Sequence, residues 1–181
     1  MGRGMWKVKN TERVLDTEYV KVDKDDVALT QGREIKDFYK VTIKDCVAIV
    51  AITPNNQIIL KKEYRHCYGE ELIEIPAGVL EENEESTKAA KRELEEETGY
   101  RSEKWTFLGK TVESSAKLTN YMYIYLAEDC KKVRNQKLDY GEDIEVVEAS
   151  LNETVEMIMN NEIICNSSIG AILKVARIKG L

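Results

Sequence analysis

The sequence predicts a mixed α/β domain in which a helix in the middle of the chain covers a β-sheet. Three observations lead to this fold class. The run from Cys46 to Thr53 is continuously apolar and β-branched, as expected of a strand that is buried on both faces. The glutamate-rich segment 78–100 contains a run of good helix formers. Towards the C-terminus, the apolar residues recur with helical spacing.

Residues 1–42 are expected to form an N-terminal antiparallel β extension, followed by a main domain over residues 43–181. The segments TEYVKV, from Thr17, and REIKDFYKV, from Arg33, have the composition of strands. The run DKDD at 23–26 and the pair Gln31-Gly32 are expected to interrupt them as turns.

In the main domain, PNNQ at 54–57 is expected to turn the buried strand into a second one, QIILKKEY, which predicts a hairpin. Three later strands and two C-terminal helices follow from the patterns at 105–112, 121–129, 144–150, 151–161 and 167–178. In the last helix, the spacing puts Ile169, Ile172, Leu173 and Ala176 on one face.

Composition excludes several classes of protein. A chain of 181 residues is long enough for one substantial core, and its formal net charge of -6 argues against nucleic-acid binding through a broad basic surface. Four scattered cysteines without a CxxC pair, and His66 as the single histidine, do not suggest a zinc site. Because neither a signal peptide nor a membrane-spanning run is found, we expect a cytoplasmic protein that does not bind membranes.

The glutamate-rich segment predicts a helix from Ser86 to Thr98 that is capped by Gly99 in the left-handed conformation. Glu93, Glu96 and Glu97 then share one side of it. Like charges one turn apart cost roughly 0.2–0.5 kcal/mol, and carboxylates near a helix C-terminus oppose the macrodipole by roughly 0.3–1 kcal/mol each. A hard divalent cation would compensate for this. The residue types alone leave two readings open, a metal site and a charged solvated helix.

The spacing of this segment is more specific. Gly78, five residues, Glu84, seven residues, then Arg92-Glu93-Leu94-x-Glu96-Glu97-x-Gly99 resembles the full signature of the Nudix hydrolase family. Only the last position is loose, because Tyr100 stands where an aliphatic residue is usual. The resemblance implies the Nudix fold, with a mixed β-sheet sandwiched between helices. It also implies that water attacks phosphorus in a nucleoside diphosphate linked to another moiety, with Mg²⁺ or Mn²⁺ present.

The resemblance also implies roles for individual residues. Glu93, Glu96 and Glu97 would hold the metal ions, and the backbone carbonyl of Ala77 would be a further ligand. Arg92 would pair with a glutamate of the signature and orient it. Arg92 and Glu96 are therefore counted among the catalytic residues as well.

A closer likeness is to ADP-ribose pyrophosphatases. The stretch from Lys61 to Glu84 resembles their QYR-like strand end and LEIPAG approach to the helix, and it suggests Arg65 and Glu74 as contacts to substrate and metal. YGEDIEVVEAS resembles the acidic loop in which a glutamate acts as general base. Glu142 is the first choice for that base and Glu145 the second.

Several of these positions also have plainer readings. Arg65 could be a surface charge, and Glu142 could belong to an exposed acidic loop. Arg33 could reach a substrate or only occupy a turn, and His66 is expected to be a loop residue. The run YMYIYL is expected to form core or interface before it stacks on a base.

One departure concerns the substrate. The resembling subfamily carries an SPG-like stretch after the signature, whereas this chain has SSAKLTN with Ser115 in the place of the proline. Other nucleoside diphosphate derivatives, and a non-catalytic module that senses a nucleotide, therefore remain alternatives to ADP-ribose hydrolysis. In the resembling enzymes the N-terminal extension pairs with a second subunit and helps to bind adenosine, which predicts a homodimer.

Overall fold

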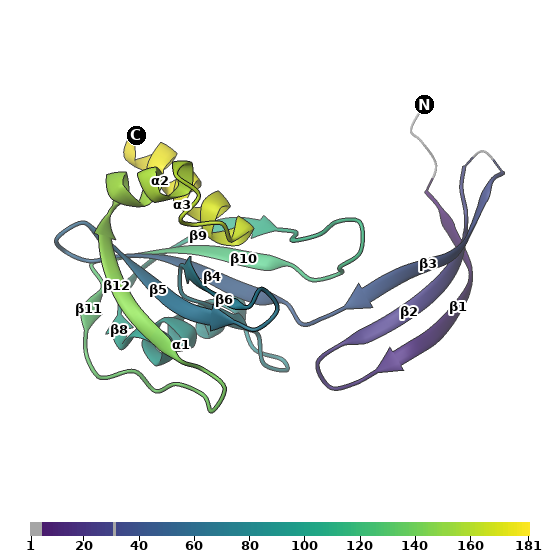
Figure 1. The fold of residues 1–181 in the computed structure, drawn as a ribbon, viewed down its shortest axis with the longest axis horizontal. Helices are drawn as coiled ribbons and strands as arrows, with labels where there is room; N and C mark the ends of the chain where they lie inside the picture. The colour runs from purple at the N-terminus through teal and green to yellow at the C-terminus, as the bar shows by residue number, and fades with distance from the viewer. Residues whose placement is uncertain (1–4, 31) are drawn as a thin grey trace. The chain divides into compact units, whose positions relative to one another are not determined.

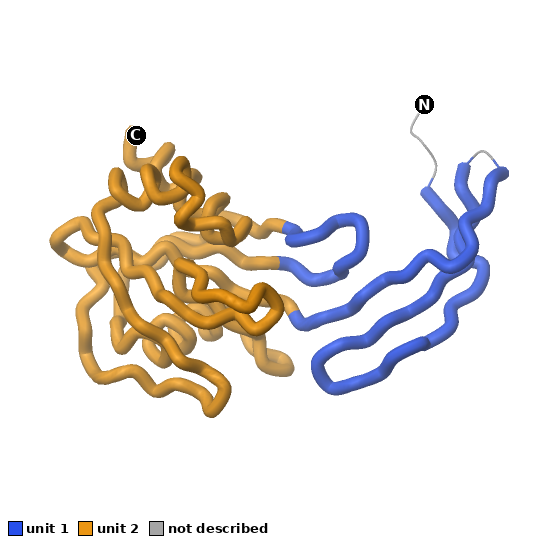
Figure 2. Tube along the Cα trace, in the orientation of Figure 1, with its two compact units in different colours: residues 1–44, 112–121 blue, residues 45–111, 122–181 orange. Residues whose placement is uncertain are grey.

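The computed structural model describes residues 5–30 and 32–181. The chain divides into two compact units, shown in Figure 2. Unit 1 consists of the chain up to Lys44 together with Val112–Tyr121, and unit 2 consists of Asp45–Thr111 and Met122–Leu181. Each unit has its own β-sheet. Among the described residues, no helix combines the length and the apolar character that crossing a membrane requires.

Unit 1 contains a three-stranded antiparallel sheet in the order β1 (Lys7–Asp16), β2 (Lys21–Ala28), β3 (Glu34–Thr42). The strand that was predicted to begin at Thr17 begins only at Lys21, because Thr17 and Val20 close the turn between β1 and β2. Strand β1 was not predicted, because the first predicted strand began only at Thr17. Of the predicted turn at Gln31 and Gly32, the first residue lies outside the described residues, and Gly32 has a positive φ of 76°.

The run DKDD was predicted to interrupt the strands as a turn, and this prediction was wrong, because DKDD lies inside β2. Asp23 and Asp25 alternate onto one face of this strand, where both are buried. They are tolerated there because Arg13 of β1 and Lys40 of β3 form ion pairs with them. Cross-strand cations therefore allow a strand where turn-forming residue types alone suggested a break.

Unit 2 contains a mixed sheet in the order β12-β5-β4-β10-β9, in which β10 and β4 are parallel and the other neighbours antiparallel. Two short strands extend it, because β6 pairs with β5 and β7 with β4. The bounds are β4 (Cys46–Ile52), β5 (Gln57–Arg65), β6 (Glu70–Glu74), β7 (Ala77–Val79), β9 (Lys104–Thr111), β10 (Met122–Glu128) and β12 (Ile144–Ser150). A separate pair joins β8 (Tyr100–Arg101) to β11 (Lys131–Lys132). The predicted hairpin of β4 and β5 is confirmed, as is the burial of β4 on both faces.

Helix α1 (Ser86–Thr98) lies on one face of this sheet, and α2 (Leu151–Met159) and α3 (Asn166–Lys179) lie on the other (Figure 1). The core is correspondingly split. Ala89, Ala90 and Leu94 of α1 pack with Val47 and Ile49 of β4. On the opposite face, α2 and α3 cover the side chains of β4, β5 and β10 that point the other way. The predicted fold class, a mixed sheet between helices with an N-terminal β extension, is confirmed.

The helix ends show how local sequence sets these elements. Gly99 caps α1 with a φ of 77°, as predicted, and a side chain there would also meet the carbonyl oxygen of Arg134 at 2.2 Å. Helix α2 begins with a capping box of Ser150 and Glu153. In α3 the predicted apolar face was partly wrong, because Leu173 is 39% exposed whereas Val175 is buried.

Candidate active site

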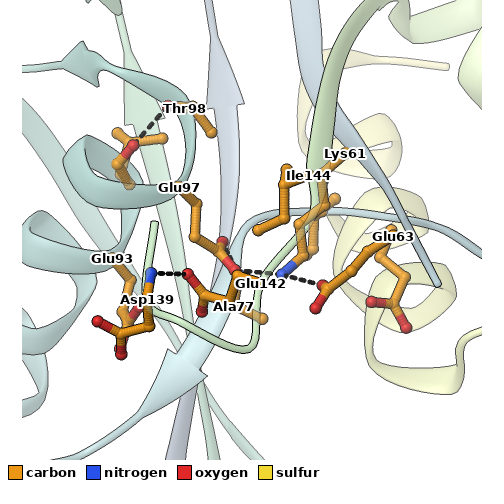
Figure 3. Close-up of polar contacts among 12 residues, drawn as sticks. Lys61, Glu63, Ala77, Glu93, Glu97, Thr98, Asp139, Glu142 and Ile144 are labelled. Atoms are coloured by element: carbon orange, nitrogen blue, oxygen red, sulfur yellow. Dashed lines mark hydrogen bonds and ion pairs between the residues drawn. The ribbon is translucent and has the colours of Figure 1, made fainter. Parts of the chain in front are cut away.

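The inner face of α1 brings two carboxylates against the sheet. Glu93 and Glu97 lie one turn apart, and both are buried between α1, β5 and β7. Figure 3 shows them beside Lys61, Ala77 and Glu142. The two strands and the helix therefore converge on one acidic site within unit 2.

Glu97 is 2% exposed and is bonded on both of its oxygens. Its Oε2 accepts a hydrogen bond from the backbone N–H of Ala77 at 2.9 Å, and its Oε1 pairs with the Nζ of Lys61. Burial raises the pKa of Glu97 to about 7, although Lys61 and the Ala77 amide act in the opposite direction. Burial would lower the pKa of Lys61, but the carboxylates of Glu97 and Glu63 outweigh it and raise that pKa.

Glu93 occupies space that only a glycine leaves. A Cβ added to Gly78 of β7 would lie 1.9 Å from the Cδ of Glu93, so any side chain at position 78 would displace this carboxylate. Burial raises the pKa of Glu93, and repulsion from Glu142 and Glu96 adds to this shift while Arg92 opposes it.

Arg92 connects the glutamates of the signature. Its Nε and Nη2 donate to Glu84 at 3.1 and 2.9 Å, and its Nη1 donates to Glu93 at 2.8 Å and to Glu96 at 3.3 Å. The guanidinium also reaches the carbonyl of Val79 in β7. These carboxylates raise the pKa of Arg92, so it stays charged. Arg92 thus has the contacts that an orienting role requires.

The structure separates the two candidates for the general base. Glu142 is half-buried in the loop before β12, near enough to Glu93 to raise its pKa, and its Oε2 accepts from the N–H of Asp139 at 2.9 Å (Figure 3). Glu145 lies on the same side of β12 as Val147, which packs against the α2 and α3 core. Glu145 therefore points away from α1.

Arg65 and Glu74 meet at the open side of the sheet. The Nε of Arg65 donates to Glu74 at 3.0 Å, and its Nη2 lies 3.0 Å from the Oε2 of Glu63. Arg65 and Glu74 line a cavity of about 290 Å³ that is also lined by residues of β7 and of the start of α3. The lining residues include Ala77, Gly78, Ser167 and Ser168.

The remaining candidates lie elsewhere. Arg33 follows the β2–β3 turn in unit 1, where its carbonyl accepts from the N–H of Leu29. His66 is exposed in the turn that Gly69 closes after β5, as expected of a loop residue. Among the described residues, no three acidic, histidine or cysteine side chains are already arranged as a metal cage. Instead, basic side chains and amides hold each carboxylate of the signature.

These residues fit a hard divalent cation. Carboxylates and a backbone carbonyl are the ligands that Mg²⁺ prefers. More carboxylates than basic groups surround the inner face of α1, and Gly78 leaves one of them room against β7. Glu93, Glu96, Glu97 and the carbonyl of Ala77 are the groups that would hold such an ion.

Lys61 and Glu63, which lie beside Glu97 in the site, were not among the predicted site residues. A signal was present, because positions 61, 63 and 65 place three charges on one face of a strand whose preceding residues are buried and apolar. That alternation could have been recognised as a charged face aimed at the helix.

Comparison with known proteins assigns the family. The sequence profile described as NUDIX domain matches residues 42–162, and the chain belongs to this family of hydrolases. Its enzyme class is a Nudix-type pyrophosphatase. The ADP-ribose pyrophosphatase of Bacillus subtilis is 31% identical over 153 residues, which cover 84% of this chain and 82% of that protein.

Two further matches extend over nearly the whole chain. The methanol dehydrogenase activator of Bacillus methanolicus is 33% identical over 167 residues, or 92% of this chain and 90% of that protein. A crystal structure of an ADP compounds hydrolase superposes with a TM-score of 0.84 over 98% of this chain and 95% of its own, at 21% identity. The second match shows that the two proteins share a fold.

Proposed function

We propose that this protein is a metal-dependent pyrophosphohydrolase that cleaves ADP-ribose or a related nucleoside diphosphate sugar to a nucleoside monophosphate and a sugar phosphate. The observation that carries the proposal is the unbalanced set of carboxylates between α1, β5 and β7. Glu93 and Glu97 are buried there with fewer cations than the surrounding glutamates would need for neutrality. Likeness to an ADP-ribose pyrophosphatase supports the substrate class.

The chemistry follows from the residues around this set. When bound, Mg²⁺ or Mn²⁺ would neutralise the pyrophosphate and make water a stronger acid. Glu142 would take the proton of the attacking water on its Oε1 atom, because Asp139 already engages Oε2. The guanidinium of Arg65, at the edge of the cavity, would bind phosphate oxygens, with Glu74 orienting it. Water oxygen bonds to one phosphorus as the anhydride P–O bond breaks.

The N-terminal β extension, residues 1–42, is proposed as the dimerisation and substrate-binding element. This segment exposes several large apolar side chains, namely Trp6 just before β1, Val8, Val14 and Leu15 of β1, and Tyr39 of β3. An interface between two copies would bury such side chains. Light scattering at micromolar concentration tests the proposed homodimer, and a monomer mass would contradict it. In the dimer, Arg33 is a candidate contact to the nucleotide.

The decisive experiment is a hydrolysis assay with Mg²⁺ across ADP-ribose, other nucleoside diphosphate sugars, dinucleoside polyphosphates and nucleoside triphosphates. Glu97→Gln serves as the control, because it keeps the size of the side chain and removes the charge. Turnover of ADP-ribose that this substitution abolishes is the expected result. Turnover of another compound would keep the reaction and change the substrate. Tight nucleotide binding without any turnover would favour a sensing module instead.

A second candidate comes from the methanol dehydrogenase activator, which matches this chain over 90% of its own length. The protein could activate an alcohol dehydrogenase. The test adds the wild-type chain or Glu97→Gln to a purified methanol dehydrogenase and follows alcohol oxidation. Stimulation by the wild type alone would link activation to hydrolysis, and no stimulation would reject this candidate.

A further inference from the structure

Lys61 is an unusual side chain for the interior of a sheet. It lies in the middle of β5 and is 1% exposed. It shares its face of the strand with Ile59, which packs in the α1 core, so its ammonium points towards α1. Lysine is almost never fully buried unless it is paired, because the desolvation of its charge is costly. A specific partner must therefore hold it.

Two carboxylates share this ammonium group. The Nζ of Lys61 pairs with the Oε1 of Glu97 on α1 and lies 3.1 Å from the Oε2 of Glu63, two residues along its own strand (Figure 3). Glu63 also contacts Arg65. Among the described residues, however, the buried Oε2 of Glu63 has no partner with hydrogen-bond geometry. Glu63 thus has spare capacity to accept a bond from Lys61.

We propose that Lys61 competes with the divalent cation for Glu97, and that Glu63 sets the strength of this competition by receiving the ammonium when Glu97 releases it. The inference rests on the proposed function, since it takes Glu97 as a metal ligand. Lys61 is a positioning residue here, because it acts on the metal through Glu97. Its charge keeps the buried carboxylate paired until the metal arrives.

Two substitutions should shift metal affinity in opposite directions. Lys61→Met removes the competitor, so Glu97 is left for the metal and Mn²⁺ should bind about tenfold more tightly. Glu63→Gln removes the carboxylate that receives the ammonium, so Lys61 stays on Glu97 and Mn²⁺ should bind about tenfold more weakly. If Lys61 only supported the fold, both substitutions would weaken the site.

The measurement is a Mn²⁺ titration followed by the electron paramagnetic resonance signal of free Mn²⁺, without substrate. Mildly alkaline buffer keeps the carboxylates ionised. Lys62→Met is the matched control, because it removes the same charge from the neighbouring position, whose side chain points to the other face of the sheet. Circular dichroism checks each variant. If Lys61→Met does not fold, the polar Lys61→Gln takes its place, with the same expectation of tighter Mn²⁺ binding.

Tighter binding in Lys61→Met together with weaker binding in Glu63→Gln, with Lys62→Met like the wild type, is the expected result. Equal affinity in all four proteins, or weaker binding in both site variants, would overturn the competition while leaving the proposed function intact. A wild-type protein that binds no Mn²⁺ would overturn the proposed metal site and this inference together.

Discussion

Both units bury acidic side chains, but they balance the charge differently. In unit 1, Asp23 and Asp25 are 6% and 4% exposed, and they are matched by Arg13 and Lys40, with the hydroxyl of Thr11 donating to Asp25 at 2.7 Å. In unit 2, glutamates outnumber their basic partners. The glutamates are Glu63, Glu74, Glu84, Glu93, Glu96 and Glu97, and the partners are Lys61, Arg65, Arg92 and the exposed Lys137.

This difference separates the structural charge network of unit 1 from the proposed ligand site of unit 2. Cations from both neighbouring strands neutralise the aspartates of unit 1, so nothing further is needed to keep them buried. Around α1, the cation that we propose would stabilise the uncompensated carboxylates on binding. Gly78 adds room for Glu93, a feature that a structural network does not require.

The largest expected effect is the loss of a proposed ligand. Glu93→Gln should lower kcat by more than about 100-fold, because substitution of groups that only support metal ligands already costs about 10–100-fold. The control is Glu95→Gln on the same helix, whose side chain pairs with Arg101 and Arg134 instead. Steady-state hydrolysis measures both variants. If Glu93→Gln keeps an activity near that of Glu95→Gln, Glu93 has a structural role and is not a metal ligand.

Gly78→Ala tests the room left for Glu93. The added Cβ would overlap the carboxylate at 1.9 Å, so Glu93 must move, and we expect kcat/KM to fall by about 100-fold. Gly170→Ala is the matched control, since a Cβ there meets nothing within 4 Å. In the helix this change should stabilise the protein by roughly 0.5–1 kcal/mol. Unchanged turnover in Gly78→Ala would show that the position of Glu93 is not critical.

A smaller effect is expected for Arg92→Lys. The ammonium keeps the charge but cannot donate to Glu84 and Glu93 through a planar fork, so metal affinity should fall by about tenfold. A titration with Mn²⁺ measures it directly, and thermal unfolding reports whether the helix survives. Affinity equal to that of the wild type would mean that charge alone, without the fork geometry, orients the glutamates.

Much of unit 2 was predictable because its patterns are local. The apolar run of β4, the turn before β5 and the cap at Gly99 each identify an element within a few residues. The N-terminal sheet was harder to predict. Asp23 and Asp25 are turn formers by composition, and only the cross-strand partners Arg13 and Lys40, distant in sequence, make them compatible with a strand.

The site was predictable where the signature of the family defines it. Spacing placed Glu93, Glu97 and Arg92 on one helix, and the structure brings them together with Glu142. The spacing of the signature did not predict Lys61, because the pairing of a strand residue with a helix residue depends on how β5 packs under α1. The alternating charges at positions 61, 63 and 65 mark a charged face of β5, but a single sequence does not show which helix residue that face meets.

The smallest expected effect is an acid transition confined to unit 1. The hydrogen bond from Arg13, together with Lys40, lowers the pKa of Asp23. Ionised Asp23 therefore stabilises the folded sheet at pH values above the ordinary pKa of an aspartate. That stability should disappear as the pH falls below about 4. In a Trp105→Phe background, the fluorescence of Trp6, which packs edge-on against Phe38 of β3, reports on this unit. Emission should shift to the red below that pH, and Asp23→Asn should remove the transition. A transition that persists in Asp23→Asn would show that other carboxylates, rather than this pair, hold the N-terminal sheet together.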